Sequence, residues 1–452
     1  MEFHVDQLNA AYISGWARDG SAPIALMLIV NGSVVAQVVA NEYRHDLLQA
    51  GYVSGHLGYS FKLRRPCLAT GDMVEIKNVA TGDILYKSSL DPAKTSGINV
   101  AYDLLGEITF AGPFWRPLLI DDGGGKVSLR GELFLPPGNT TEPALYEDGS
   151  GLVQAIIKPA SQEIAGRYWW LDGRVMEARY DAILSECRVR LRPTEESNAD
   201  ASAVLNFGVV PSQTDFANFK FAGAERARRV AGGDDSLVRF AGSGLTATLQ
   251  ILSIAGSSPN LTDTARVLDW GCGAARVLQF LKVERPGWDI HGADIDAVNI
   301  DWCKANISDL ATFQRIPLYP PTGYPDESFD LIYGLSVITH LKEVTRDAWI
   351  KELARVIKKG GTCVLTYHSA FHLLQHGISP WAVPLCAELA VRGISDSHPD
   401  PALGADLSVY YKATFNTFAN LNSAVSSWFD IVHHYPRALV YQETLVLRRR
   451  AS

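Results

Sequence analysis

The stretch Val267–Leu281, "VLDWGCGAARVLQFL", decides how the rest of the chain is interpreted. An apolar run is followed by Gly271 and Gly273 and then by a run with helical spacing. A buried strand that passes through a glycine turn into a helix is typical of folds that bind nucleotide-like ligands, because backbone N–H groups at the helix start face the ligand. The stretch therefore predicts a ligand site around residues 269–273.

The residues downstream alternate between strand patterns and helical patterns. Candidate strands lie at 266–270, 288–294, 313–317, 329–334 and 361–367. Such alternation predicts a parallel sheet covered by helices on both faces. The last two strand patterns, "FDIVHHY" and "LVYQETLVLRR", are separated by only a few residues and should pair antiparallel. We expect an α/β Rossmann-like fold with a seven-stranded, mostly parallel sheet that closes with this antiparallel pair.

The residues upstream have β character and predict two β-rich domains. A chain of 452 residues should contain two or three domains, because single cores stop growing near about 250–300 residues. We place an antiparallel β-sandwich module at 1–95 and a second β-rich domain at 96–210. The α/β domain then occupies 211–452.

Turn signals support the β character of both regions. Asn31-Gly32 lies between two apolar runs and is a strong hairpin signal, and Asp172-Gly173 is another candidate. The aromatic run Tyr168, Trp169 and Trp170 could stack on a sugar ring, but Trp in a β-sandwich more often packs in the core. We expect core packing.

Composition excludes several classes of protein. The net charge of −8 gives no basic footprint for nucleic acid, and the six cysteines form no C-x-x-C pair of a zinc knuckle or redox site. No apolar run approaches the roughly 18 residues of a membrane-spanning helix, and the N-terminus lacks a secretory signal pattern. We therefore expect a cytoplasmic protein that does not bind nucleic acid and does not span a membrane.

Charges around the glycine turn distinguish between nucleotide-like ligands. A dinucleotide fingerprint would have a third glycine where this chain has Arg276, which is better interpreted as a salt bridge on the helix face. Asp269, before the glycines, would repel a pyrophosphate but attract the cationic end of an amino acid. Asp294, 23 residues beyond Gly271 at the end of the second strand, can accept hydrogen bonds from ribose hydroxyls. A simple tight turn at the glycines, with Asp269 as a helix cap, is the alternative.

These residues resemble the class I S-adenosylmethionine-dependent methyltransferases, whose first motif has the form acidic-x-Gly-x-Gly. "GADIDAVNIDWCKAN", "YPDESFDLIYGLSVITHL" and "ELARVIKKGGTCVLTYH" follow in the order and at the spacing of that family's later motifs. The resemblance implies S-adenosylmethionine as cofactor. It implies a cofactor site in which Asp269, Gly271 and Gly273 hold the methionyl part, Asp294 the ribose and Ile295 the adenine, with Cys272 as a further cofactor-binding residue.

The family usually has an acidic residue after the third strand that meets the adenine amino group. Here the corresponding loop reads "RIPLYPPTGYP" and has no acid at that place. Tyr324 is the candidate for a wall of the adenine site.

Two histidines are candidate general bases for a hydroxyl acceptor. His340 follows the fourth strand and His368 follows the fifth, so both should lie at the carboxyl edge where open α/β sheets bind ligands. Either could be a structural histidine instead. The sequence has no cluster of acids for a divalent metal, so we expect metal independence. The long segment 369–412 predicts a lid or acceptor insertion, lined by Tyr410 and Tyr411.

The first 90 or so residues resemble a β-sandwich module appended to bacterial glycosyltransferases and other polysaccharide-assembly proteins, through "SGWARDG", "VNGSVVA" and "YRHDLLQAGYVSGHLGYSF". This resemblance implies O-methylation of a sugar or glycoconjugate acceptor in surface-polysaccharide biosynthesis, with partner enzymes bound through the β-domains. The alternatives are an inactive binding or scaffold protein and a methyltransferase of a small-molecule or protein acceptor. Arg276 and Asp269 disfavour a nicotinamide oxidoreductase. Because the motifs lie downstream, a fragment starting near residue 210 is expected to bind the cofactor alone.

Overall fold

The computed structural model describes residues 1–8, 12–20, 22–52, 55–63, 68–69, 71–90, 112–139, 142–161, 164, 168, 173–194, 205–231, 236–256, 261–375, 382–396 and 412–451. The chain divides into two compact units. One comprises Met1–Ile108, Arg167–Asp172 and Leu374–Ala390; the other comprises Thr109–Gly166, Gly173–Leu373 and Val391–Ser452.

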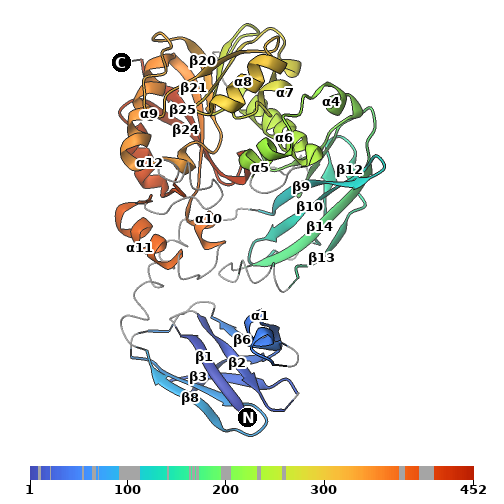
Figure 1. Cartoon of the computed structure of the whole chain (residues 1–452), viewed down its shortest axis with the longest axis vertical. Helices are drawn as coiled ribbons and strands as arrows, with labels where there is room; N and C mark the ends of the chain where they lie inside the picture. Colours follow the sequence, from blue (N-terminus) through green and yellow to red (C-terminus); the bar gives the residue numbers. More distant parts are fainter. Residues whose placement is uncertain are drawn as a thin grey trace. The chain divides into compact units, whose positions relative to one another are not determined.

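The N-terminal residues of the first unit form two four-stranded antiparallel sheets, drawn in blue in Figure 1. Their orders are β1-β2-β6-β5 and β4-β3-β7-β8. The elements are β1 (Glu2–Leu8), β2 (Tyr12–Arg18), β3 (Ala25–Val30), β4 (Ser33–Val39), β5 (Glu42–Tyr43), α1 (His45–Gln49), β6 (His56–Lys62), β7 (Met73–Asn78) and β8 (Ile84–Ser89). Asn31 and Gly32 both have positive φ and connect β3 to β4, as the hairpin signal predicted.

The second unit begins with two further antiparallel sheets, of order β13-β14-β10-β9 and β12-β11-β15-β16. Their strands are β9 (Phe114–Gly123), β10 (Lys126–Leu135), β11 (Tyr146–Glu147), β12 (Gly151–Leu152), β13 (Ile156–Pro159), β14 (Arg174–Ile183), β15 (Val189–Arg192) and β16 (Gly208–Val210). Trp115, Leu133, Leu145 and Leu191 are fully buried between them. Tyr168, which belongs to the first unit, is buried, whereas Trp169, Trp170 and Asp172 lie outside the described residues.

A seven-stranded sheet of order β19-β18-β17-β20-β21-β25-β24 follows in the second unit. Its strands are β17 (Arg266–Trp270), β18 (Asp289–Asp294), β19 (Thr312–Arg315), β20 (Phe329–Gly334), β21 (Ile357–Tyr367), β24 (Phe429–Tyr435) and β25 (Glu443–Arg449). The first five strands pair in parallel, and β25 is antiparallel to both β21 and β24. The mostly parallel sheet with its antiparallel C-terminal pair is therefore confirmed.

Helices α6 (Leu237–Gly256), α7 (Leu278–Glu284), α8 (Ala297–Asn306), α9 (Glu343–Val356) and α12 (Phe418–Val425) cover the two faces of this sheet (Figure 1). The other helices of the described residues are α4 (Gln213–Asn218), α5 (Ala224–Ala231), α10 (Ala370–Leu374) and α11 (Ala382–Arg392). The remaining short elements are the 3-10 helices η4 (Ile338–His340) and η6 (Leu439–Tyr441) and the paired strands β22 (Ile394–Ser395) and β23 (Phe415–Asn416). Side chains of α6, α7 and α8 form the core on one face, and side chains of α9 and α12 form it on the other.

Helix α6 packs against both the β-rich part of the second unit and the glycine turn. A Cβ added at Gly242 would lie 2.7 Å from Leu119 Cδ2 of β9, and one added at Gly244 would lie 2.3 Å from the Arg276 carbonyl oxygen. The helix is the one element among the described residues that is long and apolar enough to cross a bilayer, and most of its apolar window is buried inside the protein. Small residues at both contacts thus let one helix touch β9 and the turn after β17.

Two hydrogen bonds also join the β-rich part of the second unit to η6 and α6. The Tyr441 hydroxyl donates to the Pro117 carbonyl oxygen of β9 at 2.5 Å, and Gln250 Nε2 of α6 donates to the Leu205 carbonyl oxygen at 2.6 Å. A fragment starting near residue 210 would lose Leu119, Pro117 and Leu205. The structure therefore reverses our expectation for such a fragment: it would expose the packed face of α6.

Candidate functional site

The turn after β17 has a backbone conformation that glycine suits best. Gly271 and Gly273 have positive φ, and a Cβ at Gly271 would lie 2.4 Å from Val337 Cγ2. The N–H groups of Gly271 and Cys272 both donate to the Ala293 carbonyl oxygen, at 2.8 and 3.1 Å. These bonds tie the glycine turn to the end of β18, so the ends of the two strands form one site.

Asp294 accepts backbone hydrogen bonds on both carboxylate oxygens. Oδ2 accepts from Gly273 N at 2.7 Å, and Oδ1 accepts from Asp296 N at 2.8 Å. Burial raises the pKa of Asp294, and these two N–H groups partly oppose that shift. Each oxygen has a second lone pair, so the side chain retains the capacity to accept from two hydroxyl groups.

Asp269 is a buried carboxylate beside the turn, with 4% of its surface exposed. Burial is the largest cause and raises its pKa to about 7. The Tyr333 hydroxyl lowers this pKa, the Asp294 carboxylate raises it further and the Arg276 guanidinium lowers it. Among the described residues, neither Asp269 nor Asp294 has a Lys, Arg or His within ion-pair distance. Buried Asp269 and half-buried Asp294, neither of them in an ion pair, fit a ligand that is positively charged and bears hydroxyls.

Arg276 is placed differently from the expected salt bridge. It lies in the turn before α7, and its Nη1 donates to Ser243 Oγ of α6 at 2.8 Å. Burial lowers the pKa of Arg276 to about 10, and the Asp269 carboxylate opposes that shift. No carboxylate of the described residues lies within ion-pair distance of its guanidinium, because the turn directs the side chain toward α6 and away from the helix surface.

The other predicted cofactor residues lie in different places. Ile295 follows Asp294 directly and is half-buried against the core on the α9 face. The Cys272 thiol is buried, with its Sγ 3.1 Å from the place of a Cβ on Gly292 of β18. Only the backbone of Cys272 therefore belongs to the ligand-facing turn.

Tyr324 is not brought to this cluster. Its ring packs edge-to-face on His291, in the middle of β18, and on Phe329, the first residue of β20. The loop after β19 returns to the amino end of β20 and takes Tyr324 into the core there. The adenine wall at the carboxyl edge stays a prediction for this residue, and the structure gives its ring a place in the core.

The two candidate base histidines flank the same extended segment, residues 412–416. Three alternate residues of this segment donate backbone hydrogen bonds to carbonyl oxygens beside the histidines: Lys412 to His340 at 3.1 Å, Thr414 to Thr339 at 2.8 Å and Asn416 to His368 at 2.8 Å. The structure thus brings the ends of η4 and β21 to one edge, on either side of 412–416. Tyr410 and Tyr411 lie outside the described residues.

A polar network that the sequence did not indicate surrounds His368. Gln442 Nε2 donates to Ser336 Oγ at 2.7 Å and lies 3.1 Å from His368 Nε2, while its Oε1 accepts from Thr366 Oγ1 at 2.7 Å. Thr366 Oγ1 in turn accepts from Ser336 N at 2.8 Å. In this orientation the Gln442 amide donates to the Nε2 lone pair of His368, so that nitrogen is not available to take a proton from an acceptor. His340 is therefore the stronger candidate for the base.

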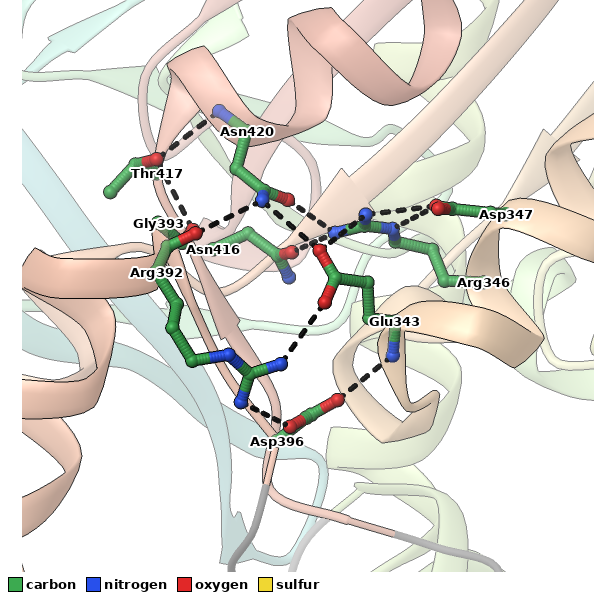
Figure 2. Close-up of polar contacts among 9 residues, drawn as sticks. All are labelled: Glu343, Arg346, Asp347, Arg392, Gly393, Asp396, Asn416, Thr417 and Asn420. Atoms are coloured by element: carbon green, nitrogen blue, oxygen red, sulfur yellow. Dashed lines mark hydrogen bonds and ion pairs between the residues drawn. The ribbon is translucent and has the colours of Figure 1, made fainter.

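Arg346 of α9 is a second unpredicted residue, and it is almost fully buried. Its Nη1 donates to Asn416 Oδ1 and to Asn420 Oδ1, both at 2.6 Å, and its Nε donates to Asp347 Oδ1 at 2.9 Å (Figure 2). No local pattern marks its contacts with Asn416 and Asn420, because these two partners lie 70 or more residues later.

Ion pairs continue the network toward the end of α11. Arg392 donates to Glu343 Oε2 at 3.0 Å and to Asp396 Oδ1 at 3.2 Å, and Asp396 Oδ2 accepts from Glu343 N at 2.9 Å (Figure 2). Together with the β22–β23 pairing, these contacts fix residues 392–396 and 416–420 to the start of α9.

Among the described residues, no three His, Cys, Asp or Glu side chains gather as metal ligands. Metal independence itself stays a prediction.

Comparisons with known proteins agree with the geometry of the glycine turn. Residues 268–365 match the family model described as "Methyltransferase domain". The chain is 31% identical over 106 residues to 27-O-demethylrifamycin SV methyltransferase of Amycolatopsis mediterranei (strain S699). That match covers 22% of this chain and 37% of the relative, so the chain spans little more than a third of the relative's length.

Solved structures that resemble parts of the chain do so at low identity. Magnesium protoporphyrin IX methyltransferase (ChlM) from Synechocystis PCC 6803, with bound SAH, is 18% identical and has a TM-score of 0.33; the match covers 50% of this chain and 93% of that one. A SAM-dependent methyltransferase from Methanosarcina mazei is also 18% identical, with a TM-score of 0.31 and coverage of 42% and 94%.

Proposed function

Because the C-terminal half of the chain holds a class I S-adenosylmethionine-dependent methyltransferase domain, we propose that the protein methylates a hydroxyl group of a sugar or glycoconjugate. The observation that carries the proposal is the pair of carboxylates, buried Asp269 and half-buried Asp294, beside a glycine turn and without a Lys, Arg or His within ion-pair distance among the described residues. S-adenosylmethionine fits this arrangement, because it has positive charge for Asp269 and ribose hydroxyls for Asp294.

The chain's own residues divide the work of the reaction. S-adenosylmethionine, when bound, supplies an activated methyl group at its sulfonium. Gly271 and Gly273 shape the turn that would hold the cofactor, Asp269 and Asp294 orient it, and His340 takes the proton of the acceptor hydroxyl. Alignment of donor and acceptor provides much of the rate in such a displacement.

Two observations support an oxygen acceptor. The name of the Amycolatopsis relative describes methylation of an O-demethyl compound. The N-terminal β-rich residues resemble modules of polysaccharide-assembly proteins, which favours a sugar as the carrier of that hydroxyl. A cytoplasmic location and partner enzymes bound by the β-rich regions belong to the same proposal, and an acceptor on a small molecule or a protein is the alternative that the experiment must separate.

The test is methyl transfer by the purified full chain from isotope-labelled S-adenosylmethionine to a panel of methyl glycosides, a phenol and a primary amine. We expect label in a glycoside and none in the amine. Gly271→Val, whose side chain would collide with Val337, is the cofactor-site control and should show no transfer. Transfer to the amine alone would contradict the acceptor class, and absence of cofactor binding by the wild type would contradict the activity.

A further inference from the structure

Two polar side chains in the 412–416 segment are buried without a hydrogen-bond partner. Thr414 and Asn416 are both 0% exposed. Thr414 Oγ1 and Asn416 Nδ2 make no hydrogen bond within the part of the chain that the structure describes. Because buried polar groups in folded proteins are nearly always paired, two such groups so close in sequence indicate a missing partner.

The orientation of the Asn416 amide follows from its contact with Arg346. Arg346 Nη1 lies 2.6 Å from Asn416 Oδ1, and a guanidinium group can only donate. The amide oxygen must therefore face Arg346, and the NH₂ group must face away from it, as Figure 2 shows. The donor that remains unpaired is consequently held in a fixed direction by a buried cation.

Hydrogen bonds of the backbone hold the chain at Thr414 and Asn416 beside the two elements that end at the candidate bases. Their backbone N–H groups bond to Thr339, next to His340, and to His368. Alternate N–H groups that donate to the same side are typical of an extended strand, in which residues two apart present their side chains on the same face. Thr414 Oγ1 and Asn416 Nδ2 therefore lie on one face of the segment, and Phe415, on which the His368 ring stacks, lies on the other.

We propose that Thr414 and Asn416 form an oxygen-recognition site for the methyl acceptor. The inference rests on the proposed function, since it assigns these groups to the acceptor of that reaction. Asn416 Nδ2 only donates and needs an oxygen with a free lone pair, whereas Thr414 Oγ1 both donates and accepts and suits a hydroxyl. A compound with neighbouring oxygens, such as a sugar, satisfies both groups; an ammonium group has only donors and cannot satisfy Asn416.

The two substitutions that test the site differ in what they remove. Asn416→Asp keeps an oxygen for Arg346 and replaces the free donor by an acceptor. Thr414→Val keeps the shape and removes the hydroxyl. The matched control is Asn420→Asp, because Asn420 Oδ1 accepts from the same Arg346 Nη1, while its Nδ2 already faces the Arg392 carbonyl oxygen at 3.3 Å and Glu343 Oε1 at 3.4 Å.

The binding measurement uses methyl glucoside as the probe, titrated into the full chain saturated with S-adenosylhomocysteine. We expect the wild type to bind it, Asn416→Asp and Thr414→Val each to weaken binding about tenfold or more, and Asn420→Asp to bind like the wild type. S-adenosylhomocysteine affinity should be unchanged in all three variants. Absence of probe binding by the wild type, equal affinity in all proteins, or equal weakening by Asn420→Asp would overturn the proposal.

A second measurement needs no ligand and keeps the proposal testable if a variant folds poorly. Thermal unfolding of the ligand-free full chain should occur at a higher temperature for Thr414→Val than for the wild type, because the substitution removes a buried unpaired group. A lower unfolding temperature would mean that the hydroxyl is already paired, and it would overturn the proposal. If the wild type fails to bind S-adenosylhomocysteine, the proposed function is refuted, and the methyl glucoside titration of the ligand-free variants still tests the oxygen site.

Discussion

Replacing Asp294 by Asn should weaken cofactor binding and, separately, destabilise the ligand-free protein. The carboxylate accepts from Gly273 N and Asp296 N and retains one lone pair on each oxygen for a ribose hydroxyl. An Asn has one oxygen, so one of the two backbone N–H groups faces an amide NH₂ and loses its partner. That unpaired N–H is present with and without ligand, so its cost of about 1–3 kcal/mol appears in the free energy of unfolding and cancels from binding.

The binding loss then comes from the ribose hydroxyls alone. In the variant, one ribose hydroxyl has no acceptor, and the other bonds to a neutral amide oxygen in place of a carboxylate oxygen. A hydrogen bond to a charged group contributes about 1.5–3 kcal/mol. This corresponds to a Kd for S-adenosylhomocysteine that is roughly 10- to 150-fold higher. Isothermal titration calorimetry measures the Kd, and urea unfolding measures the stability.

Asp296→Asn is the matched control for this change. Asp296 is the N-cap of α8, where its Oδ1 accepts from Val298 N and Asn299 N, and Asn is as good a cap as Asp. The control removes the same charge two residues away and should leave the Kd within about twofold of the wild type. A folded Asp294→Asn variant with unchanged Kd, or an equal loss in the control, would refute the assignment of Asp294 to the ribose.

Three further predictions follow from the site and the fold. Burial raises the pKa of Asp269 from 3.8 to about 7, so its contribution to the stability of the ligand-free protein is full below about pH 4 and is lost as the pH rises through about 7. Urea unfolding at about pH 5.5 and about pH 8 should show this loss of stability in the wild type. An equal loss in Asp269→Asn would contradict the prediction. His340→Gln should lower kcat by roughly 10²- to 10⁴-fold with an unchanged S-adenosylhomocysteine Kd, measured by label transfer and calorimetry; normal turnover would exclude it as the base. A fragment of residues 109–452 should be monodisperse and bind S-adenosylhomocysteine, whereas 211–452 should aggregate in size-exclusion chromatography; a soluble, cofactor-binding 211–452 would disprove the role of the α6 contacts.

Features of the site that depend on consecutive residues could be predicted from the sequence. The strand, the glycine turn and the helix that follow one another around Gly271 and Gly273 form a local unit, and the periodicity of the apolar residues indicates the parallel strands that carry it. The place of Asp294 beside Gly273 also follows, because the ends of adjacent parallel strands meet at one edge of the sheet.

Features that depend on residues far apart in the chain could not be predicted. The position of Tyr324 depends on the path of a loop between two strands, which sets whether the ring meets the carboxyl or the amino edge. The contact of Gln442 with His368 spans 74 residues and that of Arg346 with Asn416 spans 70, and single Gln, Arg and Asn residues carry no pattern that distinguishes such contacts from solvent exposure. Burial, which the sequence does not specify for a polar residue, is what gives these side chains their importance.

The two glycines of α6 have a consequence for how the second unit responds to its ligand. Gly242 lets the helix rest on Leu119 of β9, and Gly244 lets it rest on the backbone of the turn at Arg276. A close-packed contact on both sides leaves little freedom for one neighbour to move without the other. Occupation of the turn should therefore slow amide hydrogen exchange in β9, which bears none of the cofactor motifs. Thermodynamic reciprocity then requires that any substitution that loosens β9 through this contact also lowers the affinity for the ligand.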